Sequence, residues 1–496
     1  MSFTRQKSPS VGRRVRSSML CITLIAICPI AVWAVDMSAE AAAPRGATMK
    51  VTLEQIRDTA LGSDWAFQRL TDLTDQIGPR LSGSPGAAAA VTQVAEALRK
   101  LGLQVTLQPV KVPHWVRGTE NAELVDYAGR PSGLTQKVIL TALGGSSATA
   151  DRGVTAEVLV VHSFDELKAH SAEAAGRIVL FDVAFDQQLA DSGQSGSAYG
   201  QAGAYRFGGP AAASKAGAIA ALVRSVGGAD FRLPHTGATQ WNGAAPIPAA
   251  AVSVEDAMRM SRLAARGSLR MHLTLTPQTL PDVDSFNVIA DLPGRVHPEE
   301  IVIVSGHLDS WDLGQGAIDD GAGVTAAMGV AEALTRLKLQ PQRTLRIIAW
   351  MNEENGQRGA KAYLAANQSR LLQHVAAIES DFGSGRPLGM VTSVPPNALK
   401  LFKSLQPIAL TLGAATLQRR DALDSGDLSE LEVAGVPSFE PLLDGRTYFH
   451  YHHTAADTLD KVDPDHLRRQ VALLSVYAWF LAEMPQTPGR VAAQVE

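Results

Sequence analysis

The sequence predicts an α/β protein whose mostly parallel sheet is flanked by helices and is interrupted by an inserted β-rich segment. From residue 284 onward, short apolar runs rich in β-branched residues alternate with longer helical patterns. Such alternation is typical of parallel strands that helices cover on both faces. Residues 121–283 differ, because short β-like pieces are separated there by stretches rich in Gly, Ala and Ser. A chain of 496 residues is also long for one core, so we expect two domains, one inserted into the other.

The N-terminal residues predict a secretory signal peptide. Basic residues precede an apolar run at 19–35, and small residues follow it at 38–43. This order is typical of an export signal, so we expect residues 1–41 to be a signal peptide and leader, and the protein to be secreted or periplasmic. The alternative is an uncleaved anchor, but the run is short for a membrane span and contains Pro29. We therefore expect no membrane span after cleavage.

Charge and cysteine content exclude several classes of function. Cleavage after Ala34 would lower the formal net charge from -4 to near -9, which argues against nucleic acid as a partner. Both cysteines, Cys21 and Cys28, lie in the leader. The mature chain would then contain no disulfide, no thiolate metal ligand and no cysteine nucleophile.

The two segments that flank the insertion predict one α/β domain. The N-terminal part, residues 48–120, has helical patterns between 52 and 103 and an alternating strand pattern at 105–112. The second part, residues 284–485, carries the remaining strands and helices in alternation, and we expect residues 486–496 to be a loose tail. The strands are predicted at 286–291, 300–304, 344–351, 375–379 and 436–441, and the helices at 322–337, 356–366, 397–412 and 465–484.

The inserted segment, residues 121–283, predicts an accessory β-rich domain. A polar, Gly-rich stretch at 193–209 is expected to be a mobile loop, and residues 211–224 to be a helix that runs into a strand. No cluster of acidic and His residues with metal-ligand spacing occurs in this segment. Its strands are predicted at 157–161, 177–181, 247–252 and 269–275.

Acidic and imidazole side chains follow four predicted strands of the second part. They are His307, Asp309 and Asp319 in a Gly-rich loop, the pair Glu353 and Glu354, then Asp381, and finally His453. The carboxyl ends of parallel strands meet at one edge of a sheet, where ligands bind. Carboxylates crowded there repel one another unless a cation lies between them. Two imidazoles with carboxylates suit zinc better than magnesium or calcium.

The number of charges favours two zinc ions. Asp319, Glu354, Asp381 and a shared hydroxide would balance two divalent ions, with Asp319, central in its loop, as the bridging carboxylate. Adjacent side chains of an extended backbone point apart, so one of Glu353 and Glu354 ligates while the other acts as general base. The carboxylate of Asp309 is expected to accept the N–H of the His307 ring and to fix its tautomer.

These residues also carry a resemblance to a known family. The stretches Gly306-His-Leu-Asp, Gly316-Ala-Ile-Asp-Asp-Gly, Asn352-Glu-Glu, Glu379-Ser-Asp and His453-Thr-x-x-Asp-Thr resemble motifs of the co-catalytic di-zinc exopeptidases, of the carboxypeptidase Q (plasma glutamate carboxypeptidase) type. The resemblance extends from about residue 77 to residue 484 and includes Pro113-His-Trp-Val-Arg-Gly and Leu233-Pro-His-Thr-Gly.

The resemblance implies a role for each residue. His307 and Asp381 would hold one zinc ion, Glu354 and His453 the other, and Asp319 would bridge them, with Glu353 as the proton acceptor. It also implies that the insertion is a protease-associated domain and that the protein is a homodimer. The expected substrates are dipeptides or terminal residues of short peptides, hydrolysed by a hydroxide that the two ions share.

Several alternatives stay open. Asp320 competes with Asp319 for the bridge but is expected to cap the following helix, and His452 competes with His453. Arg446 or Tyr448 is a candidate for binding a substrate carboxylate. Two other functions are considered, a single-zinc enzyme like glutaminyl cyclase and a non-catalytic receptor-like relative that binds partners through the insertion. Asp312 is expected to stabilise its loop, Asp457 to bond the backbone beside His453, and residues 424–427 to contact substrate or to cap a helix.

Overall fold

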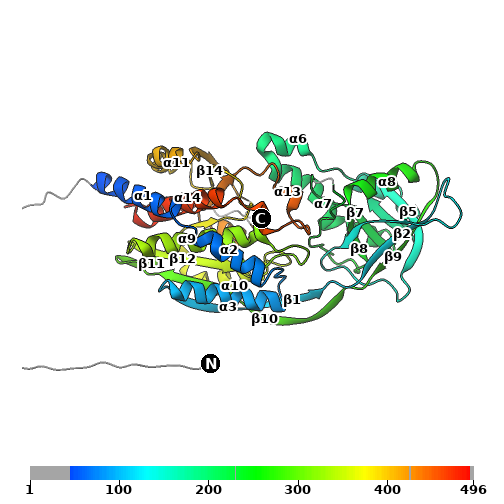
Figure 1. Cartoon of the computed structure of the whole chain (residues 1–496), viewed down its shortest axis with the longest axis horizontal. Helices are drawn as coiled ribbons and strands as arrows, with labels where there is room; N and C mark the ends of the chain where they lie inside the picture. The colour runs from blue at the N-terminus through cyan, green and yellow to red at the C-terminus, as the bar shows by residue number, and fades with distance from the viewer. Residues whose placement is uncertain (1–44, 229–230, 424–425, 492–496) are drawn as a thin grey trace, which may run out of the picture. The chain divides into compact units, whose positions relative to one another are not determined.

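The computed structural model describes residues 45–228, 231–423 and 426–491, whose strands form two eight-stranded sheets (Figure 1). The predicted signal peptide and leader, residues 1–41, lie outside the described residues. Residues 49–496 form one compact unit. Within the described chain, no helix combines the length and the apolar character needed to span a membrane.

The first sheet has a parallel centre and antiparallel edges. The central strands β12, β11, β13 and β16 run parallel to one another, whereas β10 and β14 are antiparallel to their central neighbours. In spatial order the strands are β1 (Gln104–Val116), β10 (Gln278–Leu292), β12 (Arg343–Trp350), β11 (His297–His307), β13 (His374–Glu379), β16 (Ser438–Leu443), β14 (Pro387–Thr392) and β15 (Thr416–Arg419).

Strand β11 shows why the central strands have continuously apolar sequences. Val302 and Val304 are buried in the core on one face of the sheet, whereas Ile301 and Ile303 are buried in a second cluster on the other face. Successive side chains of a strand point to opposite faces, so a strand that is covered on both sides needs apolar residues throughout. The strand leaves this core at His307, its last residue.

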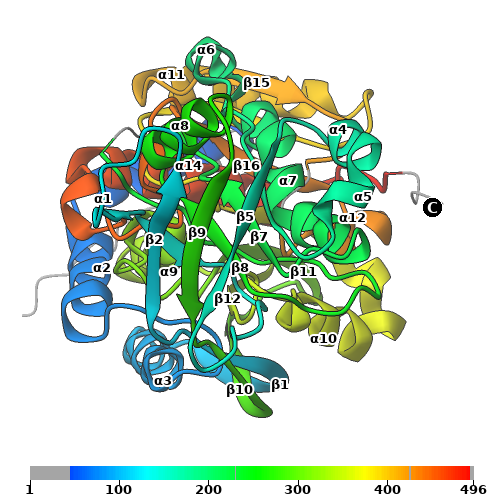
Figure 2. The same ribbon diagram turned by 90° about the vertical axis from the view of Figure 1, so that its right-hand side faces the viewer.

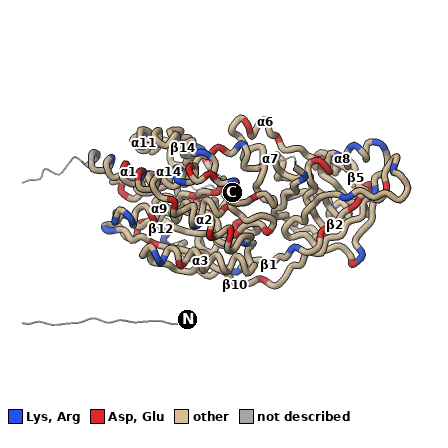
Figure 3. The backbone as a smooth tube through the Cα atoms, viewed as in Figure 1, with Lys and Arg blue, Asp and Glu red and all other residues tan. Residues whose placement is uncertain are grey.

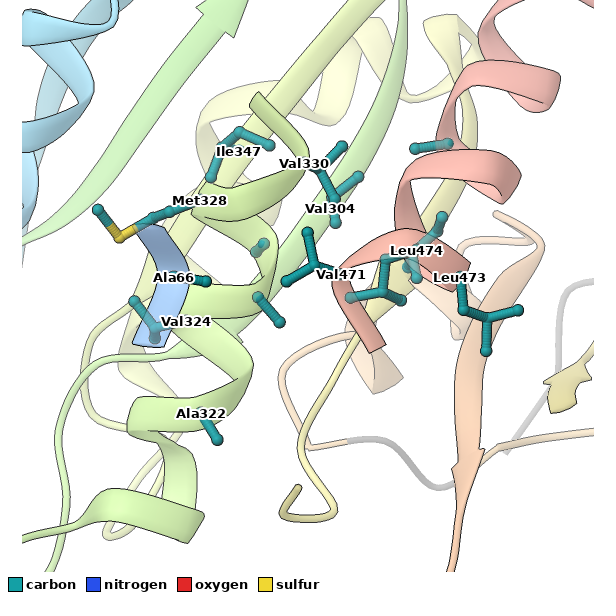
Figure 4. Packing of buried hydrophobic residues seen from close by; sticks show 14 of the residues in the cluster. Ala66, Val304, Ala322, Val324, Met328, Val330, Ile347, Val471, Leu473 and Leu474 are labelled. Atoms are coloured by element: carbon teal, nitrogen blue, oxygen red, sulfur yellow. The ribbon is translucent and has the colours of Figure 1, made fainter. Parts of the chain in front are cut away.

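Helices cover both faces of the first sheet. On one face, helices α9 and α14 pack beside each other against the strands, as Figure 4 shows for Val330 of α9, Val471 of α14 and Val304 of β11. Helices α10 and α12 contribute Tyr363 and Leu431 to the opposite face. The helices outside the second sheet are α1 (Arg45–Leu61), α2 (Trp65–Gln76), α3 (Pro85–Lys100), α9 (Ala322–Arg336), α10 (Arg358–Asn367), α11 (Gln406–Thr411), α12 (Ser429–Val433), α13 (Tyr448–Tyr451) and α14 (Pro464–Glu483), with short helical turns η2 (Ala317–Gly321), η3 (Gln368–Gln373), η4 (Leu399–Leu405) and η5 (Leu459–Lys461).

The second sheet is formed by the segment between β1 and β10, and its strands face the viewer in Figure 2. Strands β5 to β8 are mutually parallel, and the others pair antiparallel. In spatial order the strands are β3 (Gln136–Lys137), β2 (Glu120–Tyr127), β9 (Leu269–Leu275), β5 (Val154–Val161), β6 (Ile178–Phe181), β7 (Ala220–Arg224), β8 (Ala249–Val252) and β4 (Leu140–Ala142). Its helices are α4 (Phe164–Ala169), α5 (Ser171–Ala174), α6 (Gln187–Leu189), α7 (Ser195–Lys215) and α8 (Val254–Ala264), with the helical turn η1 (Ala190–Gln194).

The chain leaves the first sheet and returns to it at neighbouring points. Strands β1 and β10 pair antiparallel from Gln104 opposite Asp291 to Val116 opposite Gln278. Since the second sheet begins with β2 four residues after β1 and ends with β9 three residues before β10, all of it lies within one excursion of the chain. Acidic and basic positions are interspersed along the described backbone (Figure 3).

Three expectations about the elements were wrong. Residues 195–209 are not a loop but most of helix α7, because Ala198, Ala202 and Arg206, spaced by four, are buried. The predicted helix at 397–412 is divided into η4 and α11, and the strands β14 and β15 were not predicted. The expected loose tail is fixed as far as it is described, since Arg490 donates hydrogen bonds to three backbone carbonyls, those of Leu371, His374 and Ala434.

Candidate metal centre

His307 stands at the carboxyl end of β11, almost fully buried. Its Nε2 lies 3.1 Å from Asp319 Oδ1 and 3.1 Å from Asp381 Oδ1. Its Nδ1 lies 2.9 Å from the backbone carbonyl oxygen of Asp309. Since the Nδ1–H donates to that carbonyl, Nε2 presents its lone pair to the two carboxylates.

The expectation that the Asp309 carboxylate accepts the imidazole N–H was wrong. That carboxylate turns toward the end of β12, where its Oδ1 accepts from the backbone N–H of Asn352 at 2.6 Å and of Glu353 at 3.1 Å. The peptide carbonyl is the group within reach of the His307 ring. Asp309 therefore fixes the turn that carries the two glutamates and orients His307 only through its main chain.

Asp319 lies between the two predicted imidazole ligands. One carboxylate oxygen contacts His307, and the other is 3.1 Å from His453 Nε2. Asp320 instead accepts from the backbone N–H of His307 and of Gly323, each at 3.0 Å, and so begins helix α9 as expected. Its oxygens also lie within coordinating reach of His307 and Asp381.

Glu354 and His453 complete the cluster. Glu354 Oε2 is 3.0 Å from His453 Nε2. His452 stacks on His453 with ring centroids 3.5 Å apart, and its Nε2 is 3.4 Å from Asp319 Oδ2. His453, unlike His452, forms a close pair with Glu354 as well as with Asp319, so the geometry favours His453 over its neighbour.

The donor set fits a divalent cation. Ligand atoms of His307, Asp319 and Glu354 all lie within 4.8 Å of one another, as do those of His307, Asp320 and Asp381 and those of Asp319, His452 and His453. Asp319 Oδ2 and Glu354 Oε1 are buried and accept no hydrogen bond among the described residues. A metal ion would stabilise these three carboxylates, which have no Lys or Arg partner in the described chain and two of which have an unsatisfied oxygen.

The buried carboxylates and imidazoles of this cluster shift one another's pKa values. Burial raises the pKa of Glu354 to about 7 and also raises that of Asp381. Burial opposes a charged imidazole at His453, but the Glu354 and Asp319 carboxylates raise its pKa to about 9. Asp319 is equally buried, yet the surrounding imidazoles, His452 first, hold its pKa well below the usual range. Metal binding would displace protons bound by these groups.

Glu353 lies beside the cluster but outside its ligand groups. Among the described residues its side chain belongs to none of the sets that could hold a metal and accepts no hydrogen bond. Gly426 covers it closely, since a Cβ at that position would lie 2.5 Å from Glu353 Oε1. Burial, together with the charges of Asp381 and Glu354, raises the pKa of Glu353 well above its usual value.

The loop that carries Asp319 is fixed by Arg80, whose role the sequence did not predict, and by Asp457, which was expected to bond the backbone beside His453. Arg80 is fully buried and donates hydrogen bonds to four backbone carbonyls, three of which, those of Leu308, Gln315 and Gly316, belong to the loop. Its presence in the turn-rich stretch at 77–86 was the only signal. Asp457 accepts from the backbone N–H groups of Ala317 and Ile318, each at 2.8 Å.

Two further predicted residues differ, because Asp312 has an ionic partner and Asp427 has none among the described residues. Asp312 forms a two-point ion pair with Arg117 at 2.6 and 2.7 Å, as expected for an acid that stabilises the loop. Asp427 is fully buried, and neither of its carboxylate oxygens has a partner among the described residues, which does not fit an ordinary helix cap. Residues 424–425 lie outside the described residues.

A cavity of about 620 Å³ lies next to the cluster. Ile318 and Phe382 line it, and each is adjacent in sequence to a predicted ligand, Asp319 or Asp381. Arg446, one candidate for a substrate carboxylate, also lines it but is bound by Asp444 through two contacts of 2.8 and 2.6 Å. Arg386 lines the same cavity and forms no ion pair within the described chain.

The site has the features of a metal-dependent hydrolase, with imidazoles and carboxylates gathered at the carboxyl edge of an α/β sheet beside a cavity. Residues 287–478 match the model of peptidase family M28. The chain is 36% identical over 424 residues to carboxypeptidase Q of Mus musculus, covering 85% of this chain and 86% of that protein. The chain therefore belongs to peptidase family M28 and is a metallo-exopeptidase, which confirms the predicted resemblance.

Solved structures agree with this assignment. The crystal structure of a peptidase M28 precursor from Shewanella amazonensis SB2B is 34% identical and superposes with a TM-score of 0.83, covering 89% of this chain and 98% of that one. A zinc aminopeptidase from Bacillus subtilis, at 20% identity, has a TM-score of 0.62 over 87% of this chain and 98% of its own, so it shares the fold.

Proposed function

We propose that the chain is a di-zinc exopeptidase that hydrolyses dipeptides or terminal residues of short peptides. The observation that carries the proposal is the position of Asp319, whose two carboxylate oxygens lie 3.1 Å from His307 and from His453. Asp381 lies on the His307 side and Glu354 on the His453 side. This is the arrangement expected of two metal ions that share one carboxylate.

The assignment of ligands follows from these contacts. His307 and Asp381 would hold one ion, Glu354 and His453 the other, and Asp319 both. The mixture of imidazole and carboxylate donors and the two unsatisfied buried oxygens support zinc. When bound, two zinc ions would activate water and polarise the scissile carbonyl group.

Glu353 is the proposed general base. It would take a proton from the attacking water and deliver it to the amine of the departing residue. Its position beside Glu354, outside the ligand groups and without a hydrogen bond in the described chain, supports this role, since a base must be free to exchange protons. Asp309, which binds the Glu353 backbone N–H, would hold the base in place.

Other parts of the proposal concern the setting of the enzyme. Residues 121–283 would be a protease-associated domain inserted between the two parts of the peptidase domain, 48–120 and 284–485. The support for this is the separate sheet that the segment forms. The protein would be a homodimer that an N-terminal signal peptide directs to the periplasm or the exterior.

Zinc analysis together with dipeptide turnover tests the function. We expect two zinc ions per chain and hydrolysis of unblocked dipeptides that stops when the metal is removed and returns when zinc is restored. One ion per chain, with cyclisation of N-terminal glutamine, would favour the enzyme like glutaminyl cyclase. Bound peptide without turnover at any metal loading would favour the receptor-like alternative.

A further inference from the structure

We propose that Arg206, in helix α7 of the inserted segment, is a positioning residue of the metal centre. Its side chain holds the ring of His453 in place. The inference rests on the proposed function, because it concerns the zinc ion assigned to Glu354 and His453. It gives the inserted segment a part in building the centre, although none of the proposed ligands comes from that segment.

The geometry places Arg206 against the outer edge of the ligand. Its side chain is 2% exposed, and its Nη1 lies 3.4 Å from His453 Nδ1 and 2.5 Å from the hydroxyl oxygen of Tyr199. The guanidinium carbon lies 4.3 Å from the ring centroid of Phe207 and 5.2 Å from that of Tyr199. The group is thus fixed between aromatic rings and pressed against the imidazole.

The charge of Arg206 has no local counter-charge. Among the described residues no carboxylate forms an ion pair with it, and its buried Nε has no hydrogen-bond partner. A buried cation without a partner is unfavourable, so its position needs another reason. The nearby negative charge belongs to the centre itself, since Asp319 and Glu354 contact the opposite nitrogen of the His453 ring.

A second contact defines what Arg206 does. His453 Nδ1 lies 3.2 Å from the carbonyl oxygen of Thr236, and the Thr236 N–H donates to the His453 carbonyl at 2.9 Å. Because Nδ1–H donates to Thr236, Nε2 is left free to ligate, and Arg206 cannot donate to Nδ1. Arg206 therefore acts by packing, closing the Nδ1 edge of the ring to water and preventing its rotation.

The backbone supports the same conclusion. His453 has φ 60°, a left-handed conformation that residues with a side chain rarely adopt, so this residue must be held by its surroundings. Gly237 follows Thr236, and a Cβ there would lie 2.6 Å from three guanidinium atoms of Arg206. The absence of a side chain at 237 lets the guanidinium stack directly on the main chain that holds His453.

Zinc affinity of the purified full-length chain tests the inference. Groups that orient a metal ligand typically change metal affinity by about 10- to 100-fold when they are lost. We expect Arg206→Met to weaken one of the two zinc ions by about that factor in titrations against a chromophoric chelator. The visible spectrum of the cobalt-substituted protein should change as well, since it reports coordination geometry. Arg206→Lys keeps the charge but loses the planar face. Its zinc affinity should lie between those of the wild type and Arg206→Met.

Arg224→Met is the matched control. Arg224 is a partly buried arginine of the same segment, paired with Asp182 at 3.1 Å, so its loss destabilises the second sheet without touching His453. The zinc affinity of Arg224→Met should equal that of the wild type. Equal weakening in both variants, or unchanged affinity and spectrum in Arg206→Met, would overturn the inference.

If Arg206→Met does not fold, a second variant tests the same contact. Tyr199→Phe removes the hydroxyl that contacts Arg206 Nη1. A weakening then supports the inference, and unchanged affinity overturns it.

The zinc titrations of the wild type and of Arg206→Met also separate this inference from the proposed function. A wild-type chain that binds a single zinc ion would contradict the two-metal assignment. In that event, weaker binding of the single ion by Arg206→Met still supports the role of Arg206, and unchanged binding refutes it.

Discussion

The two sheets of this molecule both contain parallel strands, but their strand ends differ. At the end of β6 in the second sheet, Asp182 pairs with Arg224 at the end of β7. At the ends of the central strands of the first sheet, Asp319, Glu354 and Asp381 meet imidazoles and form no pair with Lys or Arg in the described chain. An acid at a strand end is therefore informative when no basic side chain neutralises it, because a metal ion can then do so.

The largest effect on activity is expected at the strand ends of the first sheet, where the acids have no basic partner. Glu353→Gln should lower kcat for a dipeptide by about 10²- to 10⁴-fold, since the amide cannot accept the proton of water. Zinc content should not change, because Glu353 lies outside the ligand groups. Steady-state kinetics and elemental analysis check both points. Loss of zinc in this variant would instead make Glu353 a ligand.

The amino end of the same sheet offers a contrast, because His374 begins β13 whereas Asp381 follows its end. Burial lowers the pKa of His374 to about 4, with Nε2 and Nδ1 bonded to the Tyr363 hydroxyl and the Arg370 carbonyl. The folded-state pKa lies below the unfolded value of about 6.5, so the unfolded chain binds the proton more readily. Stability from this residue is complete above about pH 6.5 and falls until about pH 4.

The variant His374→Gln isolates that contribution. Between pH 7 and pH 4, the wild type should lose about 3 kcal/mol more unfolding free energy than the variant, in urea titrations at each pH. The same acid dependence in both proteins would show that His374 does not titrate on unfolding. Such a result would remove the contrast between a histidine that serves stability at the amino end of the sheet and those of the candidate metal site at the carboxyl end.

The pair at the strand ends of the second sheet should matter for stability alone. Arg224→Met leaves Asp182 without its arginine, and losing a hydrogen bond to a charged group costs about 2 kcal/mol. The unfolding free energy should fall by about that amount while kcat/KM is unchanged. A change in kcat/KM without a change in stability would mean that this strand end also serves the reaction.

The smallest effect concerns the cavity beside the first sheet. Arg386→Met should raise KM for a dipeptide with a free carboxyl group by about fivefold, as expected for one exposed charge contact. The matched variant Arg446→Met should leave KM close to that of the wild type, since Asp444 already binds that guanidinium. The opposite ranking would assign the carboxylate to Arg446, one of the two residues, with Tyr448, that the sequence suggested.

The sequence predicted best where local pattern and position in the sheet agree. The apolar runs before His307 and Asp381 could be identified as strands, and the meeting of parallel strand ends then brought distant residues together. Helix α7 was missed because its glycines and serines favour loops. Burial of Ala198, Ala202 and Arg206 overrides that preference, and such burial cannot be read from the segment itself.

Contacts between distant segments were beyond the sequence. Asp309 was expected to bind the His307 ring, but whether its carboxylate or its carbonyl does so depends on where the turn at Asn352 lies. The support that Arg80 gives to the loop requires four carbonyls to face one guanidinium. The strand β14 escaped notice because it is short and begins with a proline, which is typical of loops and edges.

The hydrogen bonds between Thr236 and His453 join positions 217 residues apart, one in the inserted segment and one in the C-terminal part of the chain. During synthesis, Thr236 leaves the ribosome long before His453, so this contact forms only after the C-terminal segment has been made. The Thr236 contacts to His453 therefore require that both the inserted segment and the C-terminal segment are present. In a nascent or truncated chain that lacks one of these two segments, the hydrogen bonds that position His453 cannot form.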